Sequence, residues 1–477
     1  MNRPAIDLFA APAEPLSRRL LLQRCGMGFG TLGLAGLLGQ ERLLAAATGS
    51  VTPHIRPRAK RVIHIFLNGG LSQVDSFDPK PVLTKNDGKP LPYRHPFTPF
   101  MTGHAMASPF RFRPRGECGT EVSELFPQIG KVVDELCLVR SMTTPSPIHE
   151  SALMLMNCGS LSQLTPSMGS WLSYGLGSEN ENLPAFVVLC PGKGRVPVKG
   201  ADNWRSAFLP PTHQGMLVDT AYRRVERLVE NVRSQRAGPE QQRRQLDLVQ
   251  QLNRQHAFER GQDDALEGRI ASYELAYRMQ IAASGAFDVD REPDHIHALY
   301  GDSDHARQML IARRLAERGV RFVQVWHGPN QPWDSHNDIF PKIRRLAPEC
   351  DRPIAALLLD LKQRGLLDET LVIVSGEFGR TPTVQMNEDG TSSKGRDHNS
   401  YGFSALLAGG GIRQGMVYGA TDDFGYKAVK NPMDVHDLHA TVLHQLGLDH
   451  QKLIYRHAGR DFRLTDVHGR VIHDILA

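Results

Sequence analysis

The stretch T-L-V-I-V-S-G-E-F-G-R-T-P, from Thr370 to Pro382, decides how the second half of this chain is interpreted. Its opening residues are apolar or β-branched and predict a buried strand. A carboxylate three residues beyond such a strand has little to pair with except a cation, an arginine or a ligand. Glu377 is therefore a candidate metal ligand, and an ion pair with Arg380 is the alternative.

Strand-like and helix-like segments alternate around this stretch. Alternation of near-continuous apolar strands with helices predicts a doubly wound α/β fold, with a mostly parallel sheet covered by helices on both faces. In such sheets the ligand site lies beyond the carboxyl ends of the strands. The predicted strands are Val62–Leu67, Leu136–Arg140, Ala185–Cys190, Arg321–Trp326, Thr370–Val374 and Ser404–Ala408, and the predicted helices include Ile148–Met156, Ala306–Arg318, Arg352–Arg364 and Val435–Leu446.

Further candidate ligands follow these strands. Asp334 and His336 form a D-x-H pair, which places both side chains on one side of an extended segment. A structural hydrogen bond between the two is the alternative. His398 lies in the motif G-R-D-H, and Asn68 follows the first strand with an amide oxygen that suits hard cations. Carboxylates and imidazoles from several strand ends are what a divalent cation requires, whether Zn, Ca, Mg or Mn.

His149 opens the helix that follows the second predicted strand. A helix N-terminus favours anions, so a phosphate or sulfate group suits this place, and a plain capping region is the alternative. The hydroxyl groups nearby have no adjacent base in the sequence, so no Ser-His-Asp nucleophile can be recognised. Arg380 and Arg396 are the predicted anion-binding side chains.

The composition is that of an ordinary globular protein. The chain has 477 residues, of which 40% are hydrophobic and 22% are charged, and its formal net charge is +5. No run of Lys or Arg interleaved with aromatic residues occurs, so we expect no nucleic-acid partner. Five cysteines follow Cys25 without a C-x-x-C pair, and Cys137 and Cys190 are expected to be buried thiols. The oligomeric state cannot be inferred.

The expected organisation is one α/β domain over residues 48–477. Within it, residues from about 216 to 300 are rich in Arg, Glu and Gln with apolar residues at helical spacing, and we interpret them as a helical insertion that breaks at Gly238-Pro239. Lys80–Gly116 is expected to be a long surface excursion, and Glu121–Val132 is expected to be a helix.

Residues 1–47 precede this domain. Arg18-Arg19 stand before a short, glycine-rich apolar stretch and before Ala45-Ala46-Ala47, which suits a cleavage site. This order resembles a twin-arginine export signal and predicts a periplasmic or other extracytoplasmic location, and an amphipathic N-terminal helix is the alternative. The apolar stretch is too short for a membrane span, so no stable transmembrane segment is expected in the mature chain.

Taken together, the motifs resemble those of an exported bacterial family of unknown function, of the DUF1501 type. They are the twin-arginine start, V-I-H-I-F-L-N-G-G-L-S-Q-V-D-S-F-D-P-K, W-D-S-H, S-G-E-F-G-R-T-P, G-R-D-H and S-A-L-L-A-G-G-G-I. That family is similar to a branch of the alkaline phosphatase and sulfatase superfamily. The resemblance implies a metal-centred site in which Asn68 stands for the usual first Asp, Glu377 keeps a carboxylate, and His149 stands at the nucleophile position.

Two functions are compatible with these features. The first is an exported, metal-dependent hydrolase of phosphate or sulfate esters, acting on a small molecule or a polysaccharide. In it Asn68, Asp334, His336, Glu377 and His398 would hold the metal, and His149 would be a nucleophile or an acid. The second is a non-catalytic binding or envelope-scaffold protein that keeps the fold with a degenerate site.

Overall fold

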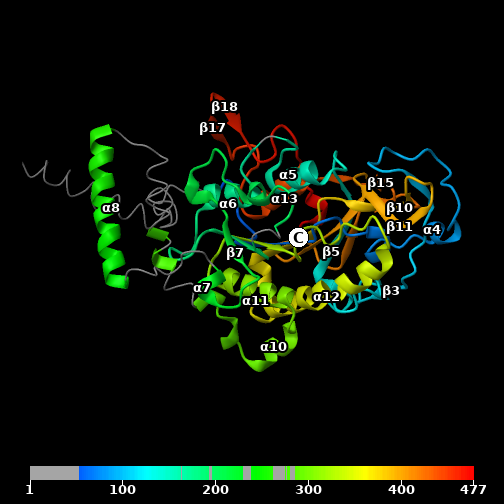
Figure 1. Cartoon of the computed structure of the whole chain (residues 1–477), viewed down its shortest axis with the longest axis horizontal. Coiled ribbons are helices and arrows are strands. Elements are labelled where there is room, and N and C mark those ends of the chain that lie inside the picture. Colours follow the sequence, from blue (N-terminus) through cyan, green and yellow to red (C-terminus); the bar gives the residue numbers. More distant parts are fainter. Residues whose placement is uncertain are drawn as a thin grey trace, which may run out of the picture. The chain divides into compact units, whose positions relative to one another are not determined.

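The computed structural model describes residues 53–162, 164–192, 196–228, 238–260, 274, 275, 277–279 and 285–477. In this part of the chain, one large sheet of nine strands organises the fold, in the order β13-β5-β12-β9-β1-β8-β6-β7, with β16 paired to β5 (Figure 1). Its strands are β1 (Arg61–Phe66), β5 (Leu136–Thr143), β6 (Phe186–Cys190), β7 (Met216–Asp219), β8 (Phe322–Trp326), β9 (Thr370–Ser375), β12 (Phe403–Ala408), β13 (Met416–Tyr418) and β16 (Met433–Asp434).

The sheet is mostly parallel, as the sequence predicts. β1 pairs in parallel with β8 and β9, and β6 pairs in parallel with β8 and β7. β12 runs antiparallel to both of its neighbours, β5 and β9. Because β1, β9 and β8 are parallel neighbours, their carboxyl ends meet at one edge of the sheet, where an α/β fold of this kind places its ligands.

Helices cover both faces of the sheet. Successive residues of β1 contribute to opposite cores, Ile63 and Ile65 to one and Val62 and Phe66 to the other, because side chains alternate along a strand. Figure 1 shows α5, α6 and α13 over one face and α10, α11 and α12 over the other. The helices are α3 (Gln73–Ser76), α4 (Pro81–Lys85), α5 (His149–Cys158), α6 (Met168–Leu176), α7 (Val225–Leu228), α8 (Pro239–Arg260), α10 (Asp294–Tyr300), α11 (Asp304–Glu317), α12 (Ile339–Gln363) and α13 (Val435–Gln445).

Smaller sheets lie beside the large one. The sheet of β2 (Thr102–Ala105), β10 (Gly379–Met386) and β11 (Ser392–Asn399) carries the residues that follow β9, and it pairs Arg380 with His398. The other short strands are β3 (Phe112–Arg115), β4 (Thr120–Ser123), β14 (Ala420–Thr421), β15 (Ala428–Lys430), β17 (Tyr455–His457) and β18 (Arg460–Phe462).

Several sequence expectations differ from the structure. Glu121–Val132 is not a helix, because Thr120–Ser123 forms β4 against β3 and only a short 3-10 turn follows at Ile129–Lys131. Met216, where we expected the helical insertion to begin, opens β7, which adds to the edge of the large sheet beside β6. Lys80–Gly116, which we expected to be a long surface excursion, is mostly exposed or half-buried and contains α4, β2 and β3.

Two further points concern the termini and the thiols. The predicted export signal, residues 1–47, lies outside the described residues. Among the described helices, none combines the length and the apolar character that crossing a bilayer requires.

Cys137 and Cys190 are buried free thiols, as expected, and Cys118, Cys158 and Cys350 are also unpaired.

Candidate metal centre

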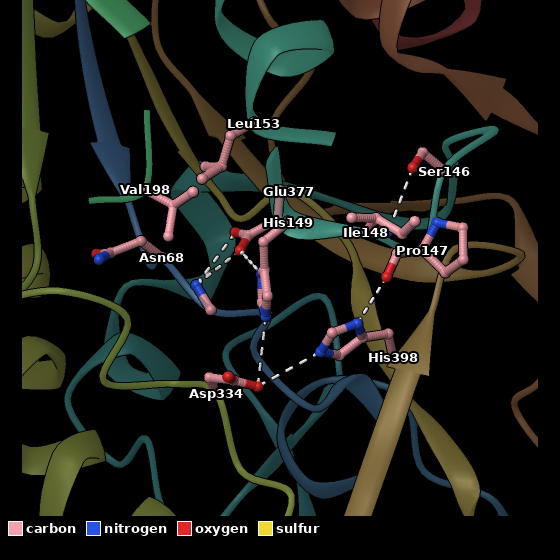
Figure 2. Close-up of polar contacts among 12 residues, drawn as sticks. Asn68, Ser146, Pro147, Ile148, His149, Leu153, Val198, Asp334, Glu377 and His398 are labelled. Atoms are coloured by element: carbon pink, nitrogen blue, oxygen red, sulfur yellow. Dashed lines mark hydrogen bonds and ion pairs between the residues drawn. The ribbon is translucent and has the colours of Figure 1, made fainter. Parts of the chain in front are cut away.

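Asp334 lies at the centre of a cluster of imidazoles at the carboxyl edge of the sheet. Its Oδ1 atom is 2.9 Å from His336 Nε2. It is 3.4 Å from His149 Nε2 and from His398 Nε2, and Figure 2 shows these two contacts. The ligand atoms of these four side chains all lie within 4.8 Å of one another. Ligands that each sit about 2.0–2.2 Å from a zinc ion lie at most about 4.4 Å apart, so small side-chain shifts would let the four atoms share one ion.

The second nitrogen of each imidazole is held by an oxygen acceptor. Nδ1 of His149 donates to Glu377 Oε1 at 2.7 Å, Nδ1 of His336 to Gln385 Oε1 at 2.5 Å, and Nδ1 of His398 to the Pro147 carbonyl at 2.6 Å. A carbonyl oxygen can only accept, so the hydrogen of a neutral His398 resides on Nδ1 and Nε2 offers its lone pair. Metal-binding histidines are oriented in this way, with the outer N–H fixed and the inner nitrogen free.

Charge is concentrated around Asp334. Burial alone would raise the pKa of Asp334, but its contacts with His149, His336 and His398 and the Arg380 charge hold that pKa well below its usual range. Burial lowers the pKa of His398 to about 3, so this imidazole is neutral. Burial also acts to lower the pKa of His149, but Asp334 and Glu377 outweigh it and raise the pKa to about 9. A proton on His149 thus balances the carboxylates, which is the task of a cation in such a cluster.

The segments that carry these residues are locked together through their backbones. A Cβ atom at Gly69, whose φ is +106°, would lie 2.4 Å from the Asp334 backbone nitrogen, so only glycine fits the turn after β1. The backbone N–H of Arg396 donates to the Ser335 carbonyl at 3.1 Å. The W-D-S-H and G-R-D-H motifs therefore run side by side, and this places His336 and His398 on the same side of Asp334.

Not all of the predicted metal ligands lie in the cluster. His149, which we expected to be catalytic, lies inside the cluster. Glu377, which we expected to be a ligand, lies behind His149 and also accepts from the Gly69 backbone N–H at 2.9 Å. Asn68 points away from Asp334, and its amide nitrogen donates to the Asn330 carbonyl (Figure 2). Of the predicted metal ligands, the structure thus brings together Asp334, His336 and His398, with His149 in place of Glu377 and Asn68.

The two predicted anion-binding arginines have different surroundings. Arg380 is fully buried, lies 2.7 Å from Asp334 Oδ1, and donates from Nε to the Gly70 carbonyl at 3.1 Å. Its partner is therefore Asp334, and not Glu377 as the ion-pair alternative held. Arg396 is also fully buried, and it donates to both carboxylate oxygens of Asp75 at 2.8 and 3.2 Å. Its guanidinium is occupied by this pair.

Sequence reasoning did not identify two residues that shape the cluster. Gln385 on β10 orients His336, but an amide inside a strand gives no motif. Phe100 packs its ring against His336 at a centroid distance of 4.8 Å, and its backbone N–H donates to Asp397 at 2.8 Å. The only signal for Phe100 is the run of prolines and aromatic residues around it. Asp334 is 27% exposed and His336 20%, so solvent reaches the cluster from this side.

The fold resembles several solved structures at low similarity. The PsFucS1 sulfatase from Pseudoalteromonas sp. is 14% identical, with a TM-score of 0.34, and the match covers 85% of this chain and 70% of the sulfatase. A phosphonate monoester hydrolase from Silicibacter pomeroyi is 12% identical over 74% of this chain and 71% of its own, with a TM-score of 0.34. An alkaline phosphatase from the Antarctic bacterium TAB5 is 11% identical over 74% of this chain and 92% of its own, with a TM-score of 0.31. At these values the likeness carries no conclusion about activity.

Comparison of the sequence itself gives a firmer result. No curated protein matches the chain. One family model matches residues 59–476, which is nearly the whole described domain, and the family is described as a protein of unknown function, DUF1501. This match confirms the resemblance that the motifs indicated. The chain belongs to the DUF1501 family.

Proposed function

We propose that this protein is a metal-dependent hydrolase of phosphate or sulfate esters. The observation that carries the proposal is the convergence of three imidazole nitrogens and one carboxylate oxygen within 4.8 Å, with the outer nitrogen of every imidazole held by an acceptor. This common orientation leaves the three Nε2 atoms next to Asp334, as a shared metal ion would require. The cluster also lies at the carboxyl edge of a mostly parallel sheet, where α/β folds place their active sites.

The donor set bears on the identity of the metal. Three imidazoles and one carboxylate suit zinc or another first-row transition ion, whereas calcium and magnesium prefer sites made entirely of oxygen ligands. We therefore infer that His149, Asp334, His336 and His398 bind zinc or a similar ion. When bound, such an ion polarises an ester oxygen and lowers the pKa of a water molecule.

The surrounding residues have positioning roles in this proposal. Glu377 is fully buried and fixes the His149 ring through the 2.7 Å contact with Nδ1. Arg380 holds Asp334 at 2.7 Å and places a permanent positive charge next to the cluster. That charge favours an anionic ester over a neutral one, because opposite charges attract. His149 changes from the catalytic role expected from the sequence to that of a ligand.

One observation favours the alternative of a binding module. The residue that opens α5 is His149, whose Nδ1 contacts Glu377 and whose Nε2 contacts Asp334. A hydroxyl or thiol nucleophile therefore does not occupy this place. In the hydrolase proposal the attacking group is water, with no covalent intermediate on the protein. In the alternative, the cluster binds a metal and an anionic ligand without turnover.

The test combines metal analysis with a panel of phosphate and sulfate esters. Purified protein should contain close to one equivalent of a transition metal per chain. His336→Ala and His149→Ala should each lose the metal and turnover together. The matched control is His295→Ala, because His295 is an exposed histidine on α10 that is not part of the cluster. It should retain both.

The outcomes distinguish the hydrolase from the binding module, and both from a protein that has no metal centre. Metal with turnover that both cluster variants abolish supports the hydrolase. Metal without turnover on any ester favours the binding module. If His149→Ala retains the metal but loses turnover, His149 is catalytic, as the sequence alone suggested. If the wild-type protein binds no transition metal, the metal-centre proposal fails.

A further inference from the structure

A second cavity lies at the same edge of the sheet as the metal centre. It has a volume of about 340 Å³, and its lining includes residues just beyond the carboxyl ends of β6, β7 and β8. Pockets for small ligands begin at about this size. No residue of the metal cluster lines the cavity. The segment after β8 connects the two, because His327 lines the cavity and Asp334 lies in the cluster.

His305 offers the cavity a hydrogen-bond acceptor. It is 5% exposed, and its Nδ1 is 2.8 Å from Gln308 Oε1. The amide nitrogen of Gln308 donates to Thr220 Oγ1 at 2.8 Å, so the oxygen of that amide faces His305. Nδ1 of His305 must therefore carry the hydrogen. Nε2 is left as a buried acceptor with no hydrogen-bond partner among the described residues.

His327 offers the cavity a hydrogen-bond donor. It is 1% exposed, and its Nδ1 accepts from Trp333 Nε1 at 3.0 Å. An indole nitrogen can only donate, so the hydrogen of a neutral His327 resides on Nε2. The nearest carboxylate oxygen, Glu349 Oε2, is 3.8 Å from that nitrogen, which is too long for a hydrogen bond. A metal ligand needs a free lone pair, which Nε2 of His327 does not have in this tautomer.

The two rings stand next to each other in their neutral forms. Their centroids are 4.5 Å apart and their planes are nearly perpendicular. Burial lowers the pKa of His305 to about 4, and burial, together with the nearby Arg345 charge, lowers the pKa of His327 well below its ordinary value. At neutral pH the cavity therefore presents one neutral donor beside one neutral acceptor.

The charged residues of the lining disfavour an anionic ligand. Among the described residues they are Asp304 and Glu349, and the described lining contains no lysine or arginine. Arg223 and Arg345 pair with these carboxylates from outside the lining, so a sulfate, phosphate or carboxylate group in the cavity would contact the carboxylates and not the arginines. A hydroxyl group suits this pair of residues, because it can both donate to an acceptor such as His305 Nε2 and accept from a donor such as His327 Nε2–H.

We propose that this cavity binds a neutral, hydroxyl-bearing unit, namely an unsubstituted sugar ring. Where the ester hydrolysis proposed above also holds, this ring belongs to the same substrate as the ester at the metal centre. Both sites lie at one edge of the sheet, and β8, from which His327 follows, is the neighbour of β1. The substrate class is then an esterified glycan whose ester group lies at the cluster and whose neighbouring unit carries free hydroxyl groups.

Nitrogen NMR of histidine-labelled protein tests the cavity directly. In the wild-type protein, His305 should be the Nδ1–H tautomer and His327 the Nε2–H tautomer. Adding glucose, galactose or fucose should shift the His305 Nε2 resonance in a saturable manner. The matched variants are followed at the His327 Nε2 resonance, which both retain. His305→Phe removes the acceptor and should weaken binding by roughly 10-fold, and His295→Phe on the exposed face of α10 should leave binding unchanged. No saturable shift with any of these sugars would overturn the proposal and leave only water in the cavity.

Turnover gives a second, separable readout. His305→Phe should raise KM for a sulfated or phosphorylated oligosaccharide by roughly 10-fold, the effect of one buried hydrogen bond. Turnover of nitrophenyl sulfate or phosphate, which has no sugar ring, should not change. If no ester is turned over at all, the hydrolase proposal fails and the NMR result still decides the cavity. If His305→Phe affects the oligosaccharide and the nitrophenyl ester equally, the sugar-binding proposal fails.

Discussion

Replacing Glu377 with glutamine tests whether Glu377 orients the metal ligand His149 or is itself a metal ligand. Glu377 accepts two hydrogen bonds in a fully buried position, from Gly69 N at 2.9 Å and from His149 Nδ1 at 2.7 Å. Both donors bind the same oxygen, Oε1, and the Gly69 nitrogen also lies 3.2 Å from Oε2. Glutamine can keep an oxygen at the Oε1 position but carries no charge, so the bond from His149 changes from a charge-assisted to a neutral one, which costs about 1–1.5 kcal/mol.

The expected loss in metal affinity follows from this role. Removing the partner of a metal-binding histidine typically weakens metal binding by about 10- to 100-fold, or about 1.4–2.7 kcal/mol. The lower end of this range agrees with the cost of replacing a charge-assisted hydrogen bond by a neutral one. We therefore expect Glu377→Gln to bind zinc 10- to 100-fold more weakly than the wild-type protein in competition with a chromogenic chelator.

The control for this variant is Asp351→Asn. Asp351 is also a buried carboxylate that accepts from two backbone N–H groups, those of Gln128 at 2.9 Å and Ile129 at 2.7 Å. It contacts no residue of the metal cluster in these hydrogen bonds. Asp351→Asn should lower the melting temperature to a similar extent and leave zinc affinity unchanged. Unchanged zinc affinity in Glu377→Gln would refute the reasoning, and complete loss of binding would make Glu377 a direct ligand.

Three further predictions address other parts of the molecule. Replacing Arg18 and Arg19 with lysine should trap the precursor in the cytoplasm, and unaltered periplasmic yield on fractionation would contradict the export signal. Arg396→Ala should lower the free energy of unfolding by about 3–5 kcal/mol, because it leaves the buried Asp75 carboxylate unpaired, as urea denaturation would measure. Burial lowers the pKa of His439 to about 3, so the folded state takes up fewer protons than the unfolded state below pH 6.5. Stability should therefore fall as the pH drops from 6.5 towards 3, and this fall should be shallower in His439→Gln.

The controls for the last two predictions are available in the same chain. Lys60 pairs with Glu369 at 2.7 Å on the surface, and such exposed pairs contribute about 0–1 kcal/mol. Lys60→Ala should therefore change stability far less than Arg396→Ala, and equal effects would argue against the burial explanation. A pH profile of unfolding that does not differ between His439→Gln and the wild-type protein would contradict the proposed titration.

The strands were predictable because their signal is local. β1, β8 and β9 are continuous apolar runs, and the alternation with helices fixes their mostly parallel pairing. β4 and β7 were missed because each is four residues long and is stabilised by a partner strand instead of its own pattern. Thr120–Ser123 gains its conformation from pairing with β3, which a helical count of apolar residues does not capture.

The sequence identified the residues around the site, but not which of them face the cluster. The D-x-H spacing and the strand-end rule identify Asp334, His336 and His398 as neighbours. Which of His149 and Glu377 faces the cluster depends on the turn after β9, where Glu377 contacts the Gly69 backbone. That choice is made by a contact across 308 positions of sequence, and spacing within one segment carries no information about it.

The same long-range contacts determine when the metal centre can exist. His149 and Glu377 are 228 positions apart, and His398 contacts Pro147 from 251 positions away, so no short fragment of the domain contains the whole cluster. An ion that binds only the completed cluster stabilises the whole domain, and chelation should destabilise it globally. If the twin-arginine segment directs transport of an already folded chain, the ion is acquired before the membrane is crossed. The metal content of the protein would then record the ion supply of the compartment where it folds, and not that of the compartment where it works.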